Sequence, residues 1–459
     1  MEKLTKKYGL PTAICMVVGI VIGSGIFFKA QDVLNLTGGN AGYGVLAWLI
    51  GGAIMVTFTT TFAVMATKYE KMGGVMDYAE ATCGKNYTYF IGWFITTVYY
   101  PAMTSVLAWI CAKFTVSAFG GEDPETGAPT MILAGFFLIA TYAINALSPK
   151  LAGKVQVSAT VIKMIPLCVI ALVGTVAGLV NGTLISNFAE GAEVVQGTSA
   201  GGAGVFAAIC CTAFAYEGWI IATSINAELK NSKRNLPIAL CLGALIVVAA
   251  YVLYYVGALG LLDVDILLKN GTGEAFKFFG VFGEMAINFF IIISCLGTLN
   301  GLMLASTRGM YSLAARDRGP SPKIFGEISD SSNMPTNSAV IGLLICMGWL
   351  LYFVGGQFFG WFGNYAFDSS ELPIITIYAF YVPMLIAFMI KGKGTHPVKR
   401  FLLPFLSLIG AGIMIAASIF RHGVGNLYYL AVFAVIMAVG GVFFFLNKRA
   451  EKKSLSQNG

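Results

Sequence analysis

The sequence predicts an all-α integral membrane protein with twelve transmembrane helices, and two observations carry this prediction. Hydrophobic residues make up 57% of the 459 residues and charged residues only 11%, whereas a soluble domain carries about 25% charged residues. The hydrophobic residues also recur in stretches of roughly 20, the length of a helix that crosses a hydrocarbon core about 30 Å thick. Such stretches are too long for barrel strands, so helices must satisfy the backbone amides inside lipid.

The hydrophobic stretches follow one another with short polar turns between them. The twelve spans are expected at residues 10–36, 41–67, 86–112, 130–147, 155–180, 201–229, 236–261, 278–307, 337–355, 372–390, 401–420 and 426–446. None of the connecting segments is long enough for a separate soluble domain. We therefore expect residues 1–459 to form a single transmembrane domain.

The lysines and arginines predict the orientation in the membrane. Most of the 29 lie in the terminal segments and in the loops of one side. The few on the opposite side are Lys29, Lys113, Lys269, Lys277 and Arg421. Because cytoplasmic loops carry the excess of basic residues, we expect a multi-pass protein of the cell (plasma) membrane with both termini in the cytoplasm. The same asymmetry accounts for the net charge of +7, because the basic residues orient the protein in the lipid bilayer. No nucleic-acid partner is needed to explain this charge.

Span 1 carries the run Gly23-Ser24-Gly25 at its centre. Each glycine weakens a helix by about 1 kcal/mol relative to alanine, so the helix could break there. Close packing is an equally good interpretation for span 1 taken alone, because Gly19 and Gly23 form a GxxxG pair that lets a neighbouring helix approach.

The pattern in span 6 favours a helix break over close packing, because Glu217 and Gly218 interrupt this span near its middle. A carboxylate at mid-membrane is costly and usually marks a function or a polar cavity, although a structural ion pair or a protonated acid would also accommodate it. Spans 1 and 6 are five apart and cross in opposite directions. Broken helices at corresponding positions of two oppositely oriented halves are typical of an inverted-repeat transporter.

Two such breaks would offer complementary chemistry. A break exposes amide N–H groups at the start of one half-helix and carbonyl groups at the end of the other. The N–H groups suit a carboxylate and the carbonyl groups suit an ammonium group. A site with both recognises the head of a free α-amino acid, so L-amino acids are the expected substrates.

Several runs resemble a known family: GIVIGSGIFF (19–28), KVQVSATVIK (154–163), FAYEGW (214–219) with ELKNSKRNLPIAL (228–240), and ISCLGTLNG (293–301) with STRGMYSLAARD (306–317). With them the chain resembles the amino acid–polyamine–organocation superfamily, and within it the L-type amino acid exchangers, the light subunits of heteromeric transporters, and their bacterial relatives. The resemblance covers residues 19 to about 337, and the last two spans carry no recognised motif.

This resemblance implies the LeuT-like fold, a 5+5 inverted repeat with discontinuous helices 1 and 6. Residues 10–180 would form the first repeat, 201–390 the second, and 401–446 two additional helices. N–H groups around Ser24 and Gly25 would hold the substrate carboxylate, carbonyls near Val21 and Phe214 would hold the amino group, and Phe214 would act as a thin lid toward the outside. The expected substrate-binding residues are Val21, Ile22, Gly23, Ser24, Gly25, Phe214, Ala215, Glu217 and Gly218.

Lys163 lies inside span 5, nine residues after Lys154 and therefore about 13 Å deeper in the membrane. The resemblance implies that Lys163 fills the place of the sodium ion of sodium-coupled relatives and bridges span 1 near Gly23 to span 8. Ser294 and Thr298 share one face of span 8 and suit this contact. We infer sodium-independent transport, while a perturbed Lys163 could alternatively carry protons.

Two positions depart from the resembled family. Eukaryotic light subunits carry a cysteine in the loop between spans 3 and 4 that bonds a partner glycoprotein, but residues 113–129 contain none. We therefore expect no disulfide-linked heavy subunit and take a monomer as the starting hypothesis. Glu217 occupies a position that varies in the family, where an acid could favour basic substrates or could organise the break.

Four functions follow as hypotheses. The first is an exchanger of small neutral L-amino acids of the alanine, serine and cysteine type, and the second is a proton-coupled permease for cationic amino acids or polyamines. A non-transporting receptor is less favoured. A membrane enzyme is disfavoured, because the spans offer no HExxH and no Ser-His-Asp set, and His396 and His422 lie in loops or at span ends. No cofactor and no metal are expected, and Asp368 and Glu371 suit the helix N-terminus that opens span 10.

Overall fold

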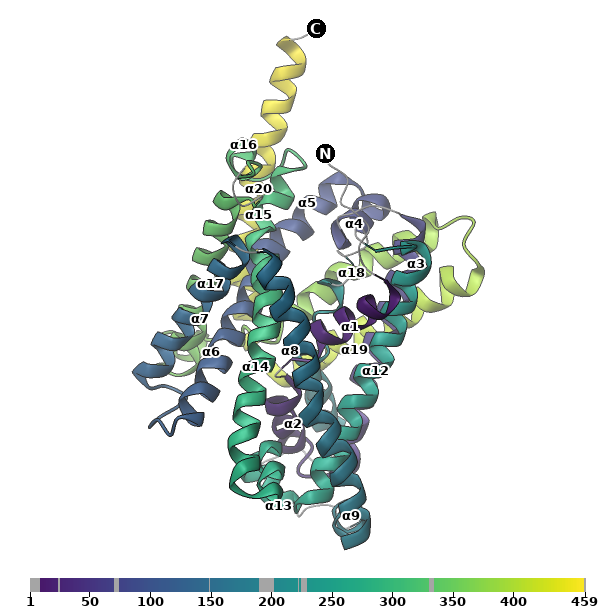
Figure 1. The fold of residues 1–459 in the computed structure, drawn as a ribbon. Coiled ribbons are helices and arrows are strands. Elements are labelled where there is room, and N and C mark those ends of the chain that lie inside the picture. The colour runs from purple at the N-terminus through teal and green to yellow at the C-terminus, as the bar shows by residue number, and fades with distance from the viewer. Residues whose placement is uncertain are drawn as a thin grey trace.

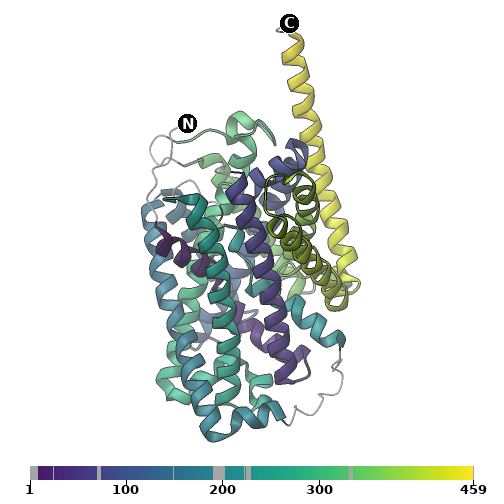
Figure 2. The ribbon, with the colours of Figure 1, turned by 90° about the vertical axis from the view of Figure 1, so that its right-hand side faces the viewer.

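The structure of the protein is a computed structural model that describes residues 9–23, 25–69, 74–147, 149–189, 202–221, 223, 229–329 and 334–457. Over these ranges the chain forms a bundle of long helices (Figure 1). α20 (Gly425–Gln457), drawn in yellow, extends beyond the rest of the bundle in both views (Figures 1 and 2). The fold class predicted from the sequence, an all-α protein with membrane-spanning helices, is confirmed.

Eleven of the described helices are each long and apolar enough to cross a membrane. A twelfth span consists of α1 (Leu10–Val21) and α2 (Gly25–Leu36), two half-helices bent by 48° at a short break. The twelve predicted spans are therefore all present. The differences lie at their ends: the third span reaches Ala118, and the eighth runs from Ala286 to Ala314.

The other helices of the first half are α3 (Ala41–Lys68), α4 (Val75–Cys83), α5 (Lys85–Phe94), α6 (Tyr100–Ala118), α7 (Ala128–Leu147), α8 (Pro149–Val169), α9 (Thr175–Asn181) and α10 (Thr183–Ala189). A π-helical turn, Ile95–Tyr99, joins α5 to α6, and another, Ile170–Gly174, joins α8 to α9. Two spans of this half, the third and the fifth, therefore contain a π-helical turn.

The second half contains α11 (Gly202–Ala215), α12 (Ser232–Leu261), α13 (Val264–Asn270), α14 (Gly280–Thr307), α15 (Gly309–Ala314), α16 (Pro322–Phe325), α17 (Thr336–Gln357), α18 (Leu372–Lys391), α19 (Leu403–His422) and α20 (Gly425–Gln457). Shorter turns are the 3-10 segments Thr272–Phe279 and Gly363–Tyr365 and the π segment Val398–Leu402.

The connections differ from the prediction of short polar turns, because α4 and α13 are helices. α13 is amphipathic: Val264 and Leu267, three residues apart, are both buried and therefore lie on one face. Gln31 of α2 donates to the carbonyl of Leu268 at 3.0 Å. The connection between spans 7 and 8 thus packs against the second half of span 1.

Packing between spans follows a repeating scheme. α1 of span 1 packs on α12 of span 7, and α11 of span 6 packs on α3 of span 2. These two contacts are equivalent if spans 1 and 2 correspond to spans 6 and 7. Likewise α6 packs on α17 and α14 packs on α7, so span 3 meets span 9 as span 8 meets span 4. These equivalent pairs are those of a LeuT-like 5+5 inverted repeat, while the exact repeat limits 10–180 and 201–390 stay predictions.

Buried aromatic side chains fix the middle of span 6 against spans 2 and 7. Trp48 of α3 makes edge contacts with Tyr216 and Tyr251, both with ring centroids 5.6 Å apart. The Tyr216 hydroxyl also donates to the carbonyl of Trp48 at 2.9 Å. Each aromatic pair adds about 0.5–1.5 kcal/mol beyond its buried area, so the chain after α11 is held in place although it is not helical.

Candidate substrate site at two broken helices

The break in span 1 begins where α1 ends at Val21. Ile22 is extended, with φ −69° and ψ 100°, and its N–H closes the last turn on the carbonyl of Val18 at 2.8 Å. Gly23 is also outside the helices, and α2 starts at Gly25. Ser24, one of the predicted substrate ligands, lies outside the described residues. Span 1 is therefore discontinuous at the predicted position.

The break in span 6 follows α11, which ends at Ala215. Glu217 and Gly218 have no helical structure, and a short 3-10 turn begins at Trp219. Gly218 has φ +104°, a backbone conformation that side chains other than hydrogen rarely allow. The glycine next to the predicted carboxylate is thus the residue that lets the chain leave the helix.

The two breaks cross in direct contact. A Cβ atom built on Gly25 would lie 2.8 Å from the Cα of Ala215, and one on Gly218 would lie 3.1 Å from the side chain of Ile20. Only a residue without a side chain allows such an approach of two backbones. Gly25 of span 1 and Gly218 of span 6 therefore let the two breaks pack directly against each other.

Tyr251 of α12 joins the two breaks. Its hydroxyl lies 3.1 Å from the carbonyl oxygen of Val21 and 3.0 Å from that of Ala215, and it donates to both. α1 and α11 end at these two residues, so their carbonyls have no intrahelical partner. One phenol thus satisfies the last carbonyl of each half-helix.

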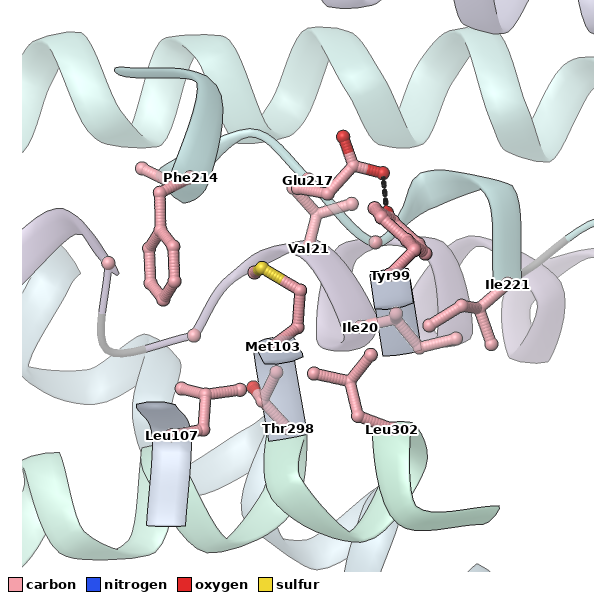
Figure 3. A pocket seen from close by; sticks show the side chains of 14 residues that line it. Ile20, Val21, Tyr99, Met103, Leu107, Phe214, Glu217, Ile221, Thr298 and Leu302 are labelled. Atoms are coloured by element: carbon pink, nitrogen blue, oxygen red, sulfur yellow. Dashed lines mark hydrogen bonds between the residues drawn. The ribbon is translucent and has the colours of Figure 1, made fainter. Parts of the chain in front are cut away.

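A small hollow of about 30 Å³ lies beside the crossing (Figure 3). Its lining comes from spans 1, 3, 6 and 8: Ile20, Val21, Gly23, Gly25, Tyr99, Met103, Leu107, Phe214, Ala215, Glu217, Gly218, Ile221, Thr298 and Leu302. Most of the predicted substrate residues are in this set, together with Thr298. Ile22, Lys163 and Ser294 are buried but do not line the hollow.

Glu217 is held by span 3 at the edge of the hollow. Its Oε1 accepts a hydrogen bond from the hydroxyl of Tyr99 (Figure 3), while its buried Oε2 has no hydrogen-bond partner among the described residues. Tyr99 is the last residue of the π-helical turn in span 3, and π-turns are frequent at functional sites. The carboxylate therefore retains one oxygen that could accept a hydrogen bond.

Phe214 covers one side of the hollow and separates it from a buried ion pair. Its ring makes an edge contact with Phe28 at 5.2 Å between centroids, and the Lys29 ammonium lies 5.7 Å from the same ring. Lys29 in turn donates to Glu371 at 2.5 Å. The aromatic ring thus forms a layer one residue thick, as a lid would.

Lys163 reaches span 1 from span 5. The side chain is fully buried, and its Nζ donates to the carbonyl of Gly19, one helical turn before the predicted contact near Gly23. A Cβ on Gly19 would lie 2.1 Å from the Thr160 hydroxyl, so α1 and α8 touch there.

The predicted bridge from Lys163 to span 8 stays a prediction. The buried hydroxyls of Ser294 and Thr298 have no hydrogen-bond partner among the described residues. A Cβ on Gly23 would lie 2.9 Å from the Thr298 hydroxyl. Span 8 therefore touches the break in span 1 directly at this residue.

Sequence reasoning missed Tyr99 and Tyr251. Both lie inside apolar spans, and their partners are 118 and 230 residues away in the chain. No local pattern marks such a partner, although a buried tyrosine hydroxyl usually has one.

Comparison with known proteins shows the family of the chain. The amino acid permease family matches residues 8–443. The serine/threonine exchanger SteT of Bacillus subtilis (strain 168) is 30% identical over 92% of this chain and 91% of its own length. The mouse (Mus musculus) b(0,+)-type amino acid transporter 1 is 25% identical over 96% and 88%, and the human (Homo sapiens) cystine/glutamate transporter is 25% identical over 74% and 66%.

The chain belongs to the amino acid permease family, within the amino acid–polyamine–organocation superfamily. The family is one of amino acid permeases, and the relatives reported above are named as transporters, one of them as an exchanger. The part of the chain that the structure describes contains eleven long apolar helices and one broken span, so the protein is a multi-pass membrane protein of the amino acid transporter class.

Proposed function

We propose that the protein is a sodium-independent exchanger of small neutral L-amino acids, of the alanine, serine and cysteine type, that works by alternating access. The observation that carries this proposal is the hollow at the crossing of two broken helices. Helix ends that meet at one hollow offer N–H groups and carbonyls to the same small molecule. The name of SteT, a serine/threonine exchanger, supports both exchange and a small substrate.

The substrate would be held by its two charged groups. The amides around Ser24 and Gly25 would bind the carboxylate, and the carbonyls near Val21 and Phe214 would bind the ammonium group, with Ile22, Gly23, Ala215 and Gly218 shaping the backbone between them. The Val21 carbonyl already accepts from Tyr251, but a carbonyl oxygen has a second lone pair.

The size of the hollow supports a short side chain. The wall opposite the two breaks is made by Met103, Leu107 and Leu302, and these apolar groups would face the substrate side chain (Figure 3). A long or charged side chain would have to displace them or reach Glu217. Neutral amino acids with one or two side-chain heavy atoms therefore fit this wall best.

Sodium independence rests on Lys163. The buried Lys163 amine bonds the Gly19 carbonyl and would thereby occupy the place between spans 1 and 5 where a sodium ion would bind. Ser294 and Thr298 complete the proposed link to span 8. The proposal also puts the protein in the cell membrane with both termini in the cytoplasm.

The proposal further treats the protein as a monomer without a disulfide-linked heavy subunit. The loop between α6 and α7, residues 119–127, contains no cysteine. It is held instead by an ion pair between Lys113 and Glu125 and by the indole N–H of Trp109, which donates to the Glu125 carbonyl at 3.1 Å.

One observation favours a second candidate, a proton-coupled permease for cationic amino acids or polyamines. Glu217 is among the residues that line the hollow, and its Oε2 has no hydrogen-bond partner among the described residues. A substrate ammonium or guanidinium could bind this carboxylate. A receptor that binds an amino acid without transporting it is the least favoured reading of the same site.

Uptake of labelled serine or alanine into proteoliposomes separates these candidates. The proposal expects uptake that requires internal amino acid and does not depend on a sodium gradient. Flux independent of internal substrate would refute exchange. Strong competition by arginine or putrescine, together with dependence on a pH gradient, would favour the second candidate, and saturable binding without flux would show a receptor.

A further inference from the structure

A second group of buried polar side chains lies on the far side of Phe214 from the hollow, where span 1 meets spans 6, 10 and 11. Glu371, the residue before α18, is completely buried and is paired with Lys29 of α2. Arg421 and His422, the last residues of α19, approach the same carboxylate. Cys210 of α11 lies beside them and is also completely buried.

The two oxygens of Glu371 have separate partners. Oε1 accepts from Lys29. Oε2 lies 3.0 Å from Nε2 of His422 and 3.9 Å from Sγ of Cys210. Sγ of Cys210 and Nε2 of His422 are 4.0 Å apart. One oxygen, one nitrogen and one sulfur from three different spans therefore face a common point.

We propose that Cys210, Glu371 and His422 form a binding site for a divalent cation of the zinc class. Zinc binds sulfur at about 2.3 Å and nitrogen or oxygen at about 2.0–2.2 Å in tetrahedral geometry, which separates neighbouring ligand atoms by about 3.3–3.8 Å. The three observed separations are within about half an ångström of that range. A thiolate with an imidazole selects zinc over magnesium or calcium, which prefer oxygen.

The charge around the cluster also suits a cation. Three carboxylates face only two permanent cations, and these groups are Asp32, Asp368, Glu371, Lys29 and Arg421. Zinc binding releases the thiol proton of Cys210 to water, so the cluster gains a net single positive charge and becomes neutral. Arg421, whose side chain is 27% exposed, can turn toward water as the metal enters.

The site is reachable and lies on elements that must move. The side chain of Asp32 is 41% exposed, so water reaches the edge of the cluster. Cys210 is on α11, which ends at the break in span 6, while the other two ligands are on spans 10 and 11. Bound zinc would tie these spans together, and alternating access requires the half-helices around the site to move. Zinc is therefore an inhibitor of the transporter at this site.

Cobalt binding to the purified protein in detergent tests the site without any transport measurement. Co²⁺ should give a near-ultraviolet thiolate-to-cobalt charge-transfer band that Zn²⁺ abolishes. Cys210→Ser should remove the band, and His422→Ala should weaken metal binding at least about tenfold, since loss of a supporting group alone costs about 10–100-fold. Cys211→Ser is the matched control, because Sγ of Cys211 faces Asp32 at 3.9 Å instead.

A band that survives Cys210→Ser, or that Cys211→Ser removes, overturns the proposal, and so does a His422→Ala variant with unchanged affinity. Size-exclusion chromatography checks that each variant is folded. If Cys210→Ser is not monodisperse, the metal affinity of His422→Ala decides on the site. The His422 side chain lies at the edge of the cluster with 9% exposure, so its loss disturbs the fold less.

Transport provides the second measurement. Zn²⁺ added outside proteoliposomes should inhibit serine uptake by the parent protein and by Cys211→Ser, but not by Cys210→Ser or His422→Ala. Equal inhibition of all four proteins overturns the inhibitory role. A preparation without any serine flux contradicts the proposed function and leaves the cobalt spectrum to decide on the metal site.

Discussion

Replacement of Tyr251 by phenylalanine removes the hydroxyl that joins the two breaks and leaves the ring in place. The hydroxyl carries one proton and faces two carbonyl oxygens, at 3.1 and 3.0 Å. Since α1 and α11 end at these carbonyls, no helical N–H takes over when the phenol is lost. The variant therefore leaves two buried acceptors without their donor.

The cost can be worked out from these contacts. A single proton shared by two acceptors counts as about one hydrogen bond, worth about 1 kcal/mol net, and an orphaned buried acceptor costs about 1–3 kcal/mol. A total of about 2 kcal/mol is a factor of about 30, since about 1.4 kcal/mol is tenfold. We expect serine flux to fall by about this factor and the unfolding temperature in detergent to fall as well.

Tyr255, four residues after Tyr251 on α12, is the matched control. Its side chain is also fully buried, but its hydroxyl has no hydrogen-bond partner among the described residues. Tyr255→Phe therefore removes a phenol without breaking a bond, and flux and unfolding temperature should equal or exceed those of the parent protein.

Two results would contradict this reasoning. If Tyr251→Phe transports serine and unfolds like the parent protein, the hydroxyl does not hold the breaks together. If Tyr255→Phe is impaired to the same degree, the effect comes from the loss of any phenol in α12 and not from the two carbonyls.

Three further variants test other parts of the site. Lys163→Ala should reduce serine flux at least about tenfold, because it leaves a buried carbonyl without its donor, and flux in proteoliposomes measures this. Gly25→Ala should cost about 1–3 kcal/mol by overpacking, because the new Cβ lies 2.8 Å from backbone. It should lower the unfolding temperature, whereas Gly412→Ala, with nothing within 4 Å, should not. Glu217→Gln should keep serine flux and weaken any competition by arginine, and unchanged competition would exclude the carboxylate as a cation ligand.

The path of the chain through the membrane follows from the length and the apolar composition of each stretch, and both can be taken directly from the sequence. Both breaks were also predictable, since Gly23 and Gly25 weaken a helix and Glu217 is costly inside an apolar span. These are local properties. They do not depend on which helices become neighbours, so a reading of the sequence can find them.

The partners across the bundle were not predictable in the same way. Lys163 was expected near Gly23 and bonds Gly19, because the rise per residue gives depth along one helix but not the tilt of the next. Glu371 does begin span 10 as predicted, but its ion pair with Lys29 joins residues 342 positions apart. Tertiary packing alone decides such contacts.

The network of contacts indicates how the two breaks would move. Tyr251 and the close approach of Gly25 to Ala215 join the breaks to each other and to span 7. Among its polar contacts, span 1 has a lysine contact on each side of its break, Lys163 to Gly19 and Lys29 to Glu371. A motion that opens one side of the hollow must release the lysine contact on that side while the crossing stays intact. The crossing would therefore move as one body, and the two lysine contacts would set which side of the hollow is closed.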